Sequence, residues 1–245
     1  MKKQLYFILI SLLTASLLSS CGKGENNQFS EDSGTFTDNR DNNTYKWVKI
    51  GTQIWMAENL KATKYADGTS ILHITDNAAW SNLGDNNADK AYCFYNNNES
   101  LGYGVLYTYA AAVNGTPYDG TNHVQGVCPD GWHVPSDVEL TELTDYLGGR
   151  SVAGGKLKET GITHWNSPNE GATNESGFTA LPGGFREQRS SGLFFDEGNG
   201  GYWWSGTENH STLGWYWILL YRDAEVYWDG GSKSAGFCVR CLKDN

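Results

Sequence analysis

Positive charge is scarce in this chain of 245 residues. The sequence has 18 lysines and arginines against 28 aspartates and glutamates, which gives a net charge of −10. No segment gathers its basic residues into a patch or onto one face of a helix. A protein this acidic is not attracted by charge to nucleic-acid backbones or anionic lipid surfaces. We therefore expect no nucleic-acid partner.

Apolar runs of the roughly 20 residues that span a bilayer are also missing. The run Leu5–Leu13, LYFILISLL, is too short, but it follows Lys2 and Lys3 and precedes LLSSC, which ends at Cys21. This order is typical of a bacterial lipoprotein signal peptide, here residues 1–20. We expect lipid on Cys21 to anchor the protein to the outer membrane, at the cell surface. The alternative is an ordinary signal peptide in which Cys21 is incidental.

The segment after Cys21, GKGENNQFSEDSGTFTDNRDNNT, has almost no aliphatic side chains. It cannot bury enough apolar surface to offset the loss of chain entropy. We expect residues 21–44 to form a flexible tether and residues 45–245 to form one domain. The alternative is a strand around Thr35 and Phe36 that packs into the domain. Removal of the signal peptide with Lys2 and Lys3 takes the net charge from −10 to −12.

Recognisable catalytic patterns are absent as well. No two of the five histidines have i, i+2 or i, i+4 spacing, and no carboxylate triad accompanies them; they are His73, His123, His133, His164 and His210. The sequence thus predicts no metal site and no cofactor. Neither WSGT nor GGFR fits the strand–elbow–helix pattern of a serine hydrolase. We interpret His133, beside Trp132, as a packed structural residue and expect no enzyme activity.

Aromatic residues and glycine are abundant, with 10 tryptophans, 14 tyrosines and 30 glycines. Alternating residues predict a hairpin that turns near Gly51 and an antiparallel meander from residue 201 to the end. In CPDGWHVPSDVELTEL, Ser136 and Glu139 form a capping box that opens an amphipathic helix, which ends at Gly148-Gly149. A long irregular region follows at residues 151–201. The sequence predicts a single α+β domain with an antiparallel sheet and few helices.

Six motifs along the chain resemble the Fibrobacter succinogenes major paralogous domain. They are, in order, VKIGTQIWMAENLKATKYADG, GVLYTYAAA, CPDGWHVPSDVELTEL, GFTALPGGFR, GYWWSGTE and GFCVRCLKD. The resemblance runs from about Trp47 to Asp244. It implies a surface lipoprotein of the kind found in Bacteroidetes and Fibrobacteres. The helix entry and final strand are also similar to C-type-lectin and formylglycine-generating-enzyme folds, which implies a lectin-like domain with a loop-rich ligand face.

Four cysteines remain if Cys21 carries lipid, and they allow three pairings. Cys238 and Cys241 point to opposite faces of a strand, so they are not expected to pair with each other. The lectin-like plan implies a bond between Cys128 and Cys241, which leaves Cys93 with Cys238. The alternative is that some or all of them are buried thiols. Cys238 replaces a serine usual in the family, and the loop after Cys93 lacks a second cysteine often found there.

The resemblance places ligand recognition in residues 164–201 and the adjoining strand. The candidate residues are Asn174, Glu175, Arg186, Trp203, Trp204, Glu208 and Asn209. Strand alternation predicts that one of the two tryptophans is exposed and stacks on a ligand; the alternative places both in the core. Arg186 is expected to orient an acidic group, or else to form an ordinary salt bridge. Calcium bound by oxygens of residues 164–177 is a weaker alternative to a solvated loop.

These observations favour a non-catalytic binding or structural module that adheres to a glycan or protein ligand. The alternative is an uncharacterised enzyme on a formylglycine-generating-enzyme-like fold. Those enzymes use a reactive cysteine pair upstream of the last strand, and residues 193–234 of this chain contain no cysteine.

Overall fold

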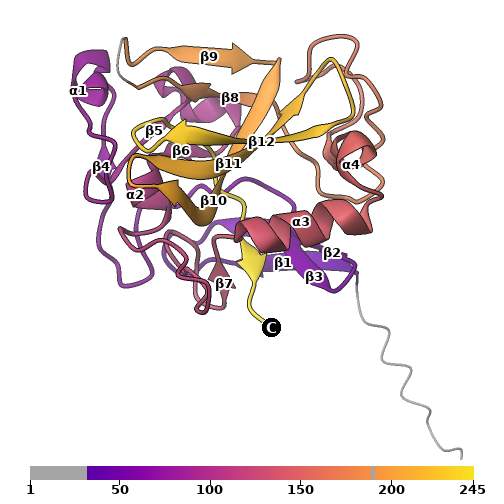
Figure 1. Ribbon diagram of the computed structural model, residues 1–245, viewed down its shortest axis with the longest axis horizontal. Helices are drawn as coiled ribbons and strands as arrows, with labels where there is room; N and C mark the ends of the chain where they lie inside the picture. Colours follow the sequence, from indigo (N-terminus) through magenta and orange to yellow (C-terminus); the bar gives the residue numbers. More distant parts are fainter. Residues whose placement is uncertain (1–31, 189–190) are drawn as a thin grey trace, which may run out of the picture. The chain divides into compact units, whose positions relative to one another are not determined.

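The computed structural model describes residues 32–188 and 191–245, so the signal peptide and Cys21 lie outside the described residues. Figure 1 shows the helices and strands. The helices of the described part are α1 (Asn77–Ser81), η1 (Tyr95–Asn97), η2 (Glu99–Leu101), α2 (Tyr109–Ala112), α3 (Asp137–Tyr146) and α4 (Arg150–Leu157). None of them is long and apolar enough to cross a membrane. Short helices combined with three sheets make the fold α+β, as predicted.

One sheet joins the two ends of the domain. Its strands, in spatial order, are β1 (Ser33–Thr37), β2 (Thr44–Ile50), β3 (Gln53–Met56), β13 (Leu242–Lys243) and β7 (Trp132–His133). The predicted hairpin around Gly51 is the turn between β2 and β3. Because β13 pairs with both β3 and β7, the C-terminus closes against the strands that open the domain.

Folded structure begins earlier than the predicted domain boundary at residue 45. β1 pairs with β2 along its whole length, so the second half of the predicted tether belongs to the domain. The buried carboxylate of Asp38 accepts hydrogen bonds from Arg40, whose Nη1 donates to the carbonyl oxygens of Lys64 and Val127, both at 2.8 Å. The polar composition did not predict this strand, because an edge strand needs few apolar residues. Phe36 is the half-buried apolar residue of β1.

The other two sheets lie above the first sheet in the view of Figure 1. The larger has the order β12 (Val226–Ser232), β11 (Leu213–Leu220), β10 (Gly200–His210), β8 (Gly183–Arg186) and β9 (Phe194–Glu197). The smaller consists of β4 (Leu72–His73), β5 (Ala91–Phe94) and β6 (Val105–Tyr107). The predicted meander is confirmed in β10, β11 and β12. α4, β8 and β9 lie in the region expected to be irregular.

The predicted capping box starts α3. The Oγ of Ser136 accepts from the backbone N–H of Glu139 at 3.4 Å, and Oε2 of Glu139 accepts from the backbone N–H of Ser136 at 2.8 Å. Two N–H groups that lack partners inside the helix are thereby satisfied.

Ser136→Ala should lower the free energy of unfolding by about 1 kcal/mol, because the N-terminal cap of α3 is lost. Urea denaturation followed by circular dichroism measures this change. Thr141→Ala is the control, since Thr141 is exposed within the same helix, and it should change stability by less than about 0.5 kcal/mol. Equal effects of the two substitutions would contradict the importance of the cap.

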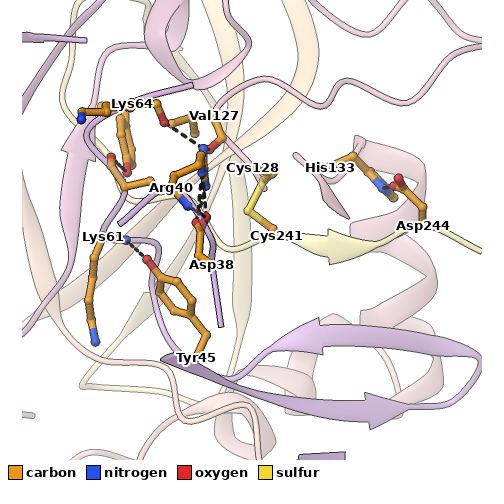
Figure 2. The surroundings of a disulfide bond; sticks show 12 residues. Asp38, Arg40, Tyr45, Lys61, Lys64, Val127, Cys128, His133, Cys241 and Asp244 are labelled. Atoms are coloured by element: carbon orange, nitrogen blue, oxygen red, sulfur yellow. Dashed lines mark hydrogen bonds and ion pairs between the residues drawn. A yellow bond between two sulfur atoms is a disulfide. The ribbon is translucent and has the colours of Figure 1, made fainter. Parts of the chain in front are cut away.

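The bond implied between Cys128 and Cys241 is present, with Cα atoms 5.9 Å apart (Figure 2). The second expected bond is not formed, because Cys93 and Cys238 are free and buried thiols. The sulfur of Cys238 instead accepts a hydrogen bond from Nδ2 of Asn59 at 3.3 Å. Burial raises the pKa of both thiols to about 12, so neither is a reactive thiolate near neutral pH.

Candidate functional site

Both tryptophans of the predicted ligand face are core residues. Trp203 and Trp204 are each 0% exposed, so the prediction that one of them is exposed is wrong. Trp203 stacks on Trp217 at 4.5 Å between ring centroids, whereas Trp204 packs against Phe237 at 4.4 Å on the opposite face. The strand does alternate as expected, but β10 is central in its sheet and both faces are covered.

Arg186 is also fully buried and is not available to a ligand. Its guanidinium donates to the carbonyl oxygens of Gly192 at 2.8 Å and Ile74 at 2.7 Å. It also lies over the ring of Trp80, 4.5 Å from the centroid. These contacts tie β8 to the segment before α1, so the role of Arg186 is structural and differs from both roles expected for it.

The remaining four candidates occupy two places in the fold. Oδ1 of Asn174 accepts from the backbone N–H of Thr179 at 2.8 Å and shapes the loop after α4. The exposed Glu175 forms an ion pair with Lys156 at 2.8 Å. On β10, Glu208 pairs with the buried ammonium of Lys233, and Asn209 is half-buried. The seven candidates therefore do not form one exposed surface.

Glu175 lines a cleft of about 600 Å³ between the β1–β2 hairpin and residues 175–177. Ser33 and Thr35 of β1 lie opposite Val48 and Lys46 of β2, so these four side chains share one face of the hairpin. Ser176 lies on the other wall of the cleft, where its hydroxyl donates to the carbonyl oxygen of Lys156 at 2.7 Å. The cleft is within the size range of small-ligand sites and presents hydroxyl, ammonium and carboxylate groups together.

A second group of polar side chains lies near the C-terminus. The rings of His123 and His133 lie one above the other, with centroids 4.0 Å apart and an interplanar angle of 31°. Oε1 of Glu139 lies 3.0 Å from Nε2 of His133. Oδ1 of Asp244 lies 2.6 Å from Nδ1 of the same ring, and Figure 2 shows these two side chains together. The expectation that His133 is a packed, hydrogen-bonded residue fits these contacts, but it missed the group around it.

Hydrogen bonds within this cluster shift the pKa values of His133 and Glu139. Burial alone would lower the pKa of His133, but its bonds to Glu139 and Asp244 outweigh burial and raise that pKa. Burial would likewise raise the pKa of Glu139, but hydrogen bonds from His133 and Ser136 lower it to about 2. Glu139 is therefore a carboxylate at physiological pH, and the cluster holds at least one fixed negative charge against the histidines.

Linear spacing gave no signal for this cluster. His123 and His133 lie on either side of the Pro129-Asp130-Gly131 turn, Glu139 is in α3, and Asp244 follows β13. β13 pairs with β7 and places Leu242 opposite His133. This pairing brings the side-chain carboxylate of Asp244 within hydrogen-bond distance of His133. Three members of the cluster, His123, His133 and Asp244, are the one group of three or more histidine, cysteine, aspartate or glutamate side chains within the described residues that is spaced to hold a metal ion. None of the loop residues considered for calcium belongs to it.

Comparison with known proteins assigns most of the described chain to a single family. The family model for the Fibrobacter succinogenes major domain matches residues 48–243, from the second half of β2 to β13. No curated protein and no solved structure matches the chain significantly. The match covers more than half of the chain and includes the six motifs except the last residue of the sixth, so the protein belongs to the Fibrobacter succinogenes major domain family.

Proposed function

We propose that this protein is a lipid-anchored, non-catalytic binding module that holds a glycan in the cleft between the β1–β2 hairpin and residues 175–177. The observation that carries the proposal is the cleft itself, which at about 600 Å³ accommodates a small saccharide. Glu175 is the one residue among the seven sequence candidates that lines it.

The chemistry of the walls supports a polyhydroxylated ligand. The exposed hydroxyls of Ser33 and Thr35 both donate and accept hydrogen bonds, as sugar hydroxyls do. Lys46 and Lys49 are exposed in the same cleft and supply positive charge for an acidic sugar. The carboxylate of Glu175 is already paired with Lys156, which reduces its repulsion of an acidic group.

The anchoring part of the proposal depends on the leader sequence. Lys2 and Lys3, the apolar run and LLSSC at Cys21 support export and lipidation at an outer membrane. β1 starts at Ser33, so about ten residues separate the lipidated cysteine from the wall of the cleft.

A glycan array probed with the full chain tests the proposal. Thr35→Trp fills the cleft and Lys46→Glu reverses the charge on its wall, so each should weaken binding at least about tenfold. Thr37→Trp is the matched control, because Thr37 is exposed on the same strand and does not line the cleft. A blank array, or binding that survives Thr35→Trp at wild-type strength, would contradict a glycan site in this cleft.

A further inference from the structure

Two imidazole rings and two carboxylates lie together in one cluster, which consists of His123, His133, Glu139 and Asp244. None of these residues lines the proposed glycan cleft. The backbone N–H of Asp244 donates to the carbonyl oxygen of Gly131 at 2.9 Å, which fixes the C-terminal segment beside the turn before β7. His133 is 2% exposed and is held in β7, whereas the side chain of His123 is 44% exposed.

One oxygen of each carboxylate lies close to a ring nitrogen of both histidines. Glu139 faces the Nε2 edge of the two rings and Asp244 faces the Nδ1 edge. Oε1 of Glu139 lies 3.0 Å from Nε2 of His133 and 3.7 Å from Nε2 of His123. Oδ1 of Asp244 lies 2.6 Å from Nδ1 of His133 and 3.8 Å from Nδ1 of His123. The other oxygen of Glu139 accepts from the backbone N–H and the hydroxyl of Ser136, so Oε1 is directed at the rings.

Three candidate ligand atoms come together at the edge that faces Asp244. Oδ1 of Asp244 lies within hydrogen-bond distance of Nδ1 of His133 and 3.8 Å from Nδ1 of His123. With each ring protonated at Nε2, beside Glu139, both Nδ1 atoms can bind a metal ion that replaces the hydrogen bond between His133 and Asp244.

We propose that His123, His133 and Asp244 bind a divalent transition-metal ion of the Zn²⁺ class, through Nδ1 of each histidine and Oδ1 of the aspartate. One ligand atom from each residue lies within 4.8 Å of the others. Two imidazoles and one carboxylate are a ligand set that zinc and similar ions prefer, whereas Ca²⁺ and Mg²⁺ favour oxygen ligands. Glu139 is a positioning residue, equivalent to the carboxylates that orient metal-bound histidines through the second ring nitrogen.

The distances require only a small adjustment. Zinc–ligand bonds of about 2.0–2.2 Å place neighbouring ligand atoms roughly 3.5 Å apart. Oδ1 of Asp244 and Nδ1 of His133 lie 2.6 Å apart and would separate by about 0.9 Å, whereas Nδ1 of His123 lies 3.8 Å from Oδ1, already close to the required spacing. The side chains of His123 and Asp244 are 44% and 46% exposed, so a fourth position is open to water.

Cobalt titration of the full chain, purified without a histidine tag and stripped with a chelator, tests the site. Co²⁺ should bind at one equivalent, produce visible d–d absorption bands, and be displaced by Zn²⁺. His123→Ala should weaken Co²⁺ binding by at least about 100-fold, and Glu139→Gln by about 10- to 100-fold, as is usual for a carboxylate behind a metal-bound histidine. Glutamine can retain the capping box, and His123 is exposed, so both variants should fold.

His164→Ala is the matched control, because His164 also pairs with a carboxylate, that of Glu159 at 2.7 Å, and should leave Co²⁺ affinity unchanged. Zn²⁺ should raise the melting temperature of wild type and His164→Ala but not of His123→Ala. Absence of d–d bands in the wild type would overturn the proposal. Wild-type affinity in His123→Ala would overturn it as well.

Discussion

Arg240→Met should lower the free energy of unfolding by about 3 kcal/mol, because it removes a buried cation from partners that cannot find replacements. Arg240 is 1% exposed. Its Nη2 donates to Oδ1 of Asn59 at 2.8 Å, and its Nη1 donates to the carbonyl oxygen of Phe178. The guanidinium also lies over the Phe178 ring, 4.1 Å from the centroid.

Two effects oppose each other in this substitution. Burial lowers the pKa of Arg240 to about 9, so methionine relieves the cost of a desolvated charge. Methionine also leaves the carbonyl oxygen of Phe178 unsatisfied, and Asn59 keeps only Trp203 Nε1, at 2.8 Å, as a donor to its Oδ1. Charged hydrogen bonds contribute about 1.5–3 kcal/mol each, and a buried orphan carbonyl costs about 1–3 kcal/mol, so the loss outweighs the relief.

Urea denaturation of Arg240→Met beside Arg222→Met measures the difference. The Arg222 side chain is 65% exposed and makes one ion pair at 3.7 Å, so its substitution should change stability by less than about 0.5 kcal/mol. If Arg240→Met and Arg222→Met unfold at the same urea concentration, the removal of a desolvated charge cancels the loss of the hydrogen bonds, and the prediction is wrong.

Elements with local signals could be predicted from the sequence. The capping box at Ser136 and Glu139 sets the start of α3 through contacts three residues apart. The turns that join β10, β11 and β12 are short and polar, and their strands alternate. Such signals depend on neighbours in the chain, so no knowledge of the tertiary fold is needed to read them.

Helix α4 shows how packing overrides propensity. Gly154 and Gly155 argue against a helix, since glycine costs about 1 kcal/mol relative to alanine in a helix interior. A Cβ at Gly154 would lie 2.5 Å from the carbonyl oxygen of Glu225, and one at Gly155 would lie 2.3 Å from that of Gly171. Only glycine allows α4 this close to two neighbouring segments. Glu225 and Gly171 are not neighbours of these glycines in the sequence, so the sequence alone does not predict why α4 contains glycine at these two positions.

The candidate site was predicted poorly for a related reason. Alternation assigned Trp203 and Trp204 correctly to opposite faces of β10, but it carries no information on whether a face is covered. The pairing of β13 with β7 that brings Asp244 to His133 likewise joins residues 111 positions apart. Glu175 became a candidate through the resemblance to lectin-like folds, and it is the one candidate of the seven that lines the proposed cleft.

Loss of the Cys128–Cys241 bond should destabilise the protein by about 4–5 kcal/mol. The two cysteines are separated by 113 residues, and the chain-entropy model gives about 4.7 kcal/mol for a closed loop of about 100 residues. The bond also joins the start of the turn before β7 to the residue before β13, and so holds the closing strand of the first sheet. Denaturation of Cys128→Ala/Cys241→Ala in urea measures the change.

The two single substitutions separate the bond from ordinary packing. Cys128→Ala and Cys241→Ala each break the same bond, so each should cost nearly as much as the double substitution, and the coupling energy should be close to the whole effect. A reducing agent should shift the wild-type midpoint to that of the double variant and leave the variant unchanged. Cys93→Ala is the control, because Cys93 is equally buried but unbonded, and it should lose only about 1 kcal/mol of packing. Additive single effects of that smaller size, with no response to reductant, would mean that the two thiols contribute only as buried side chains.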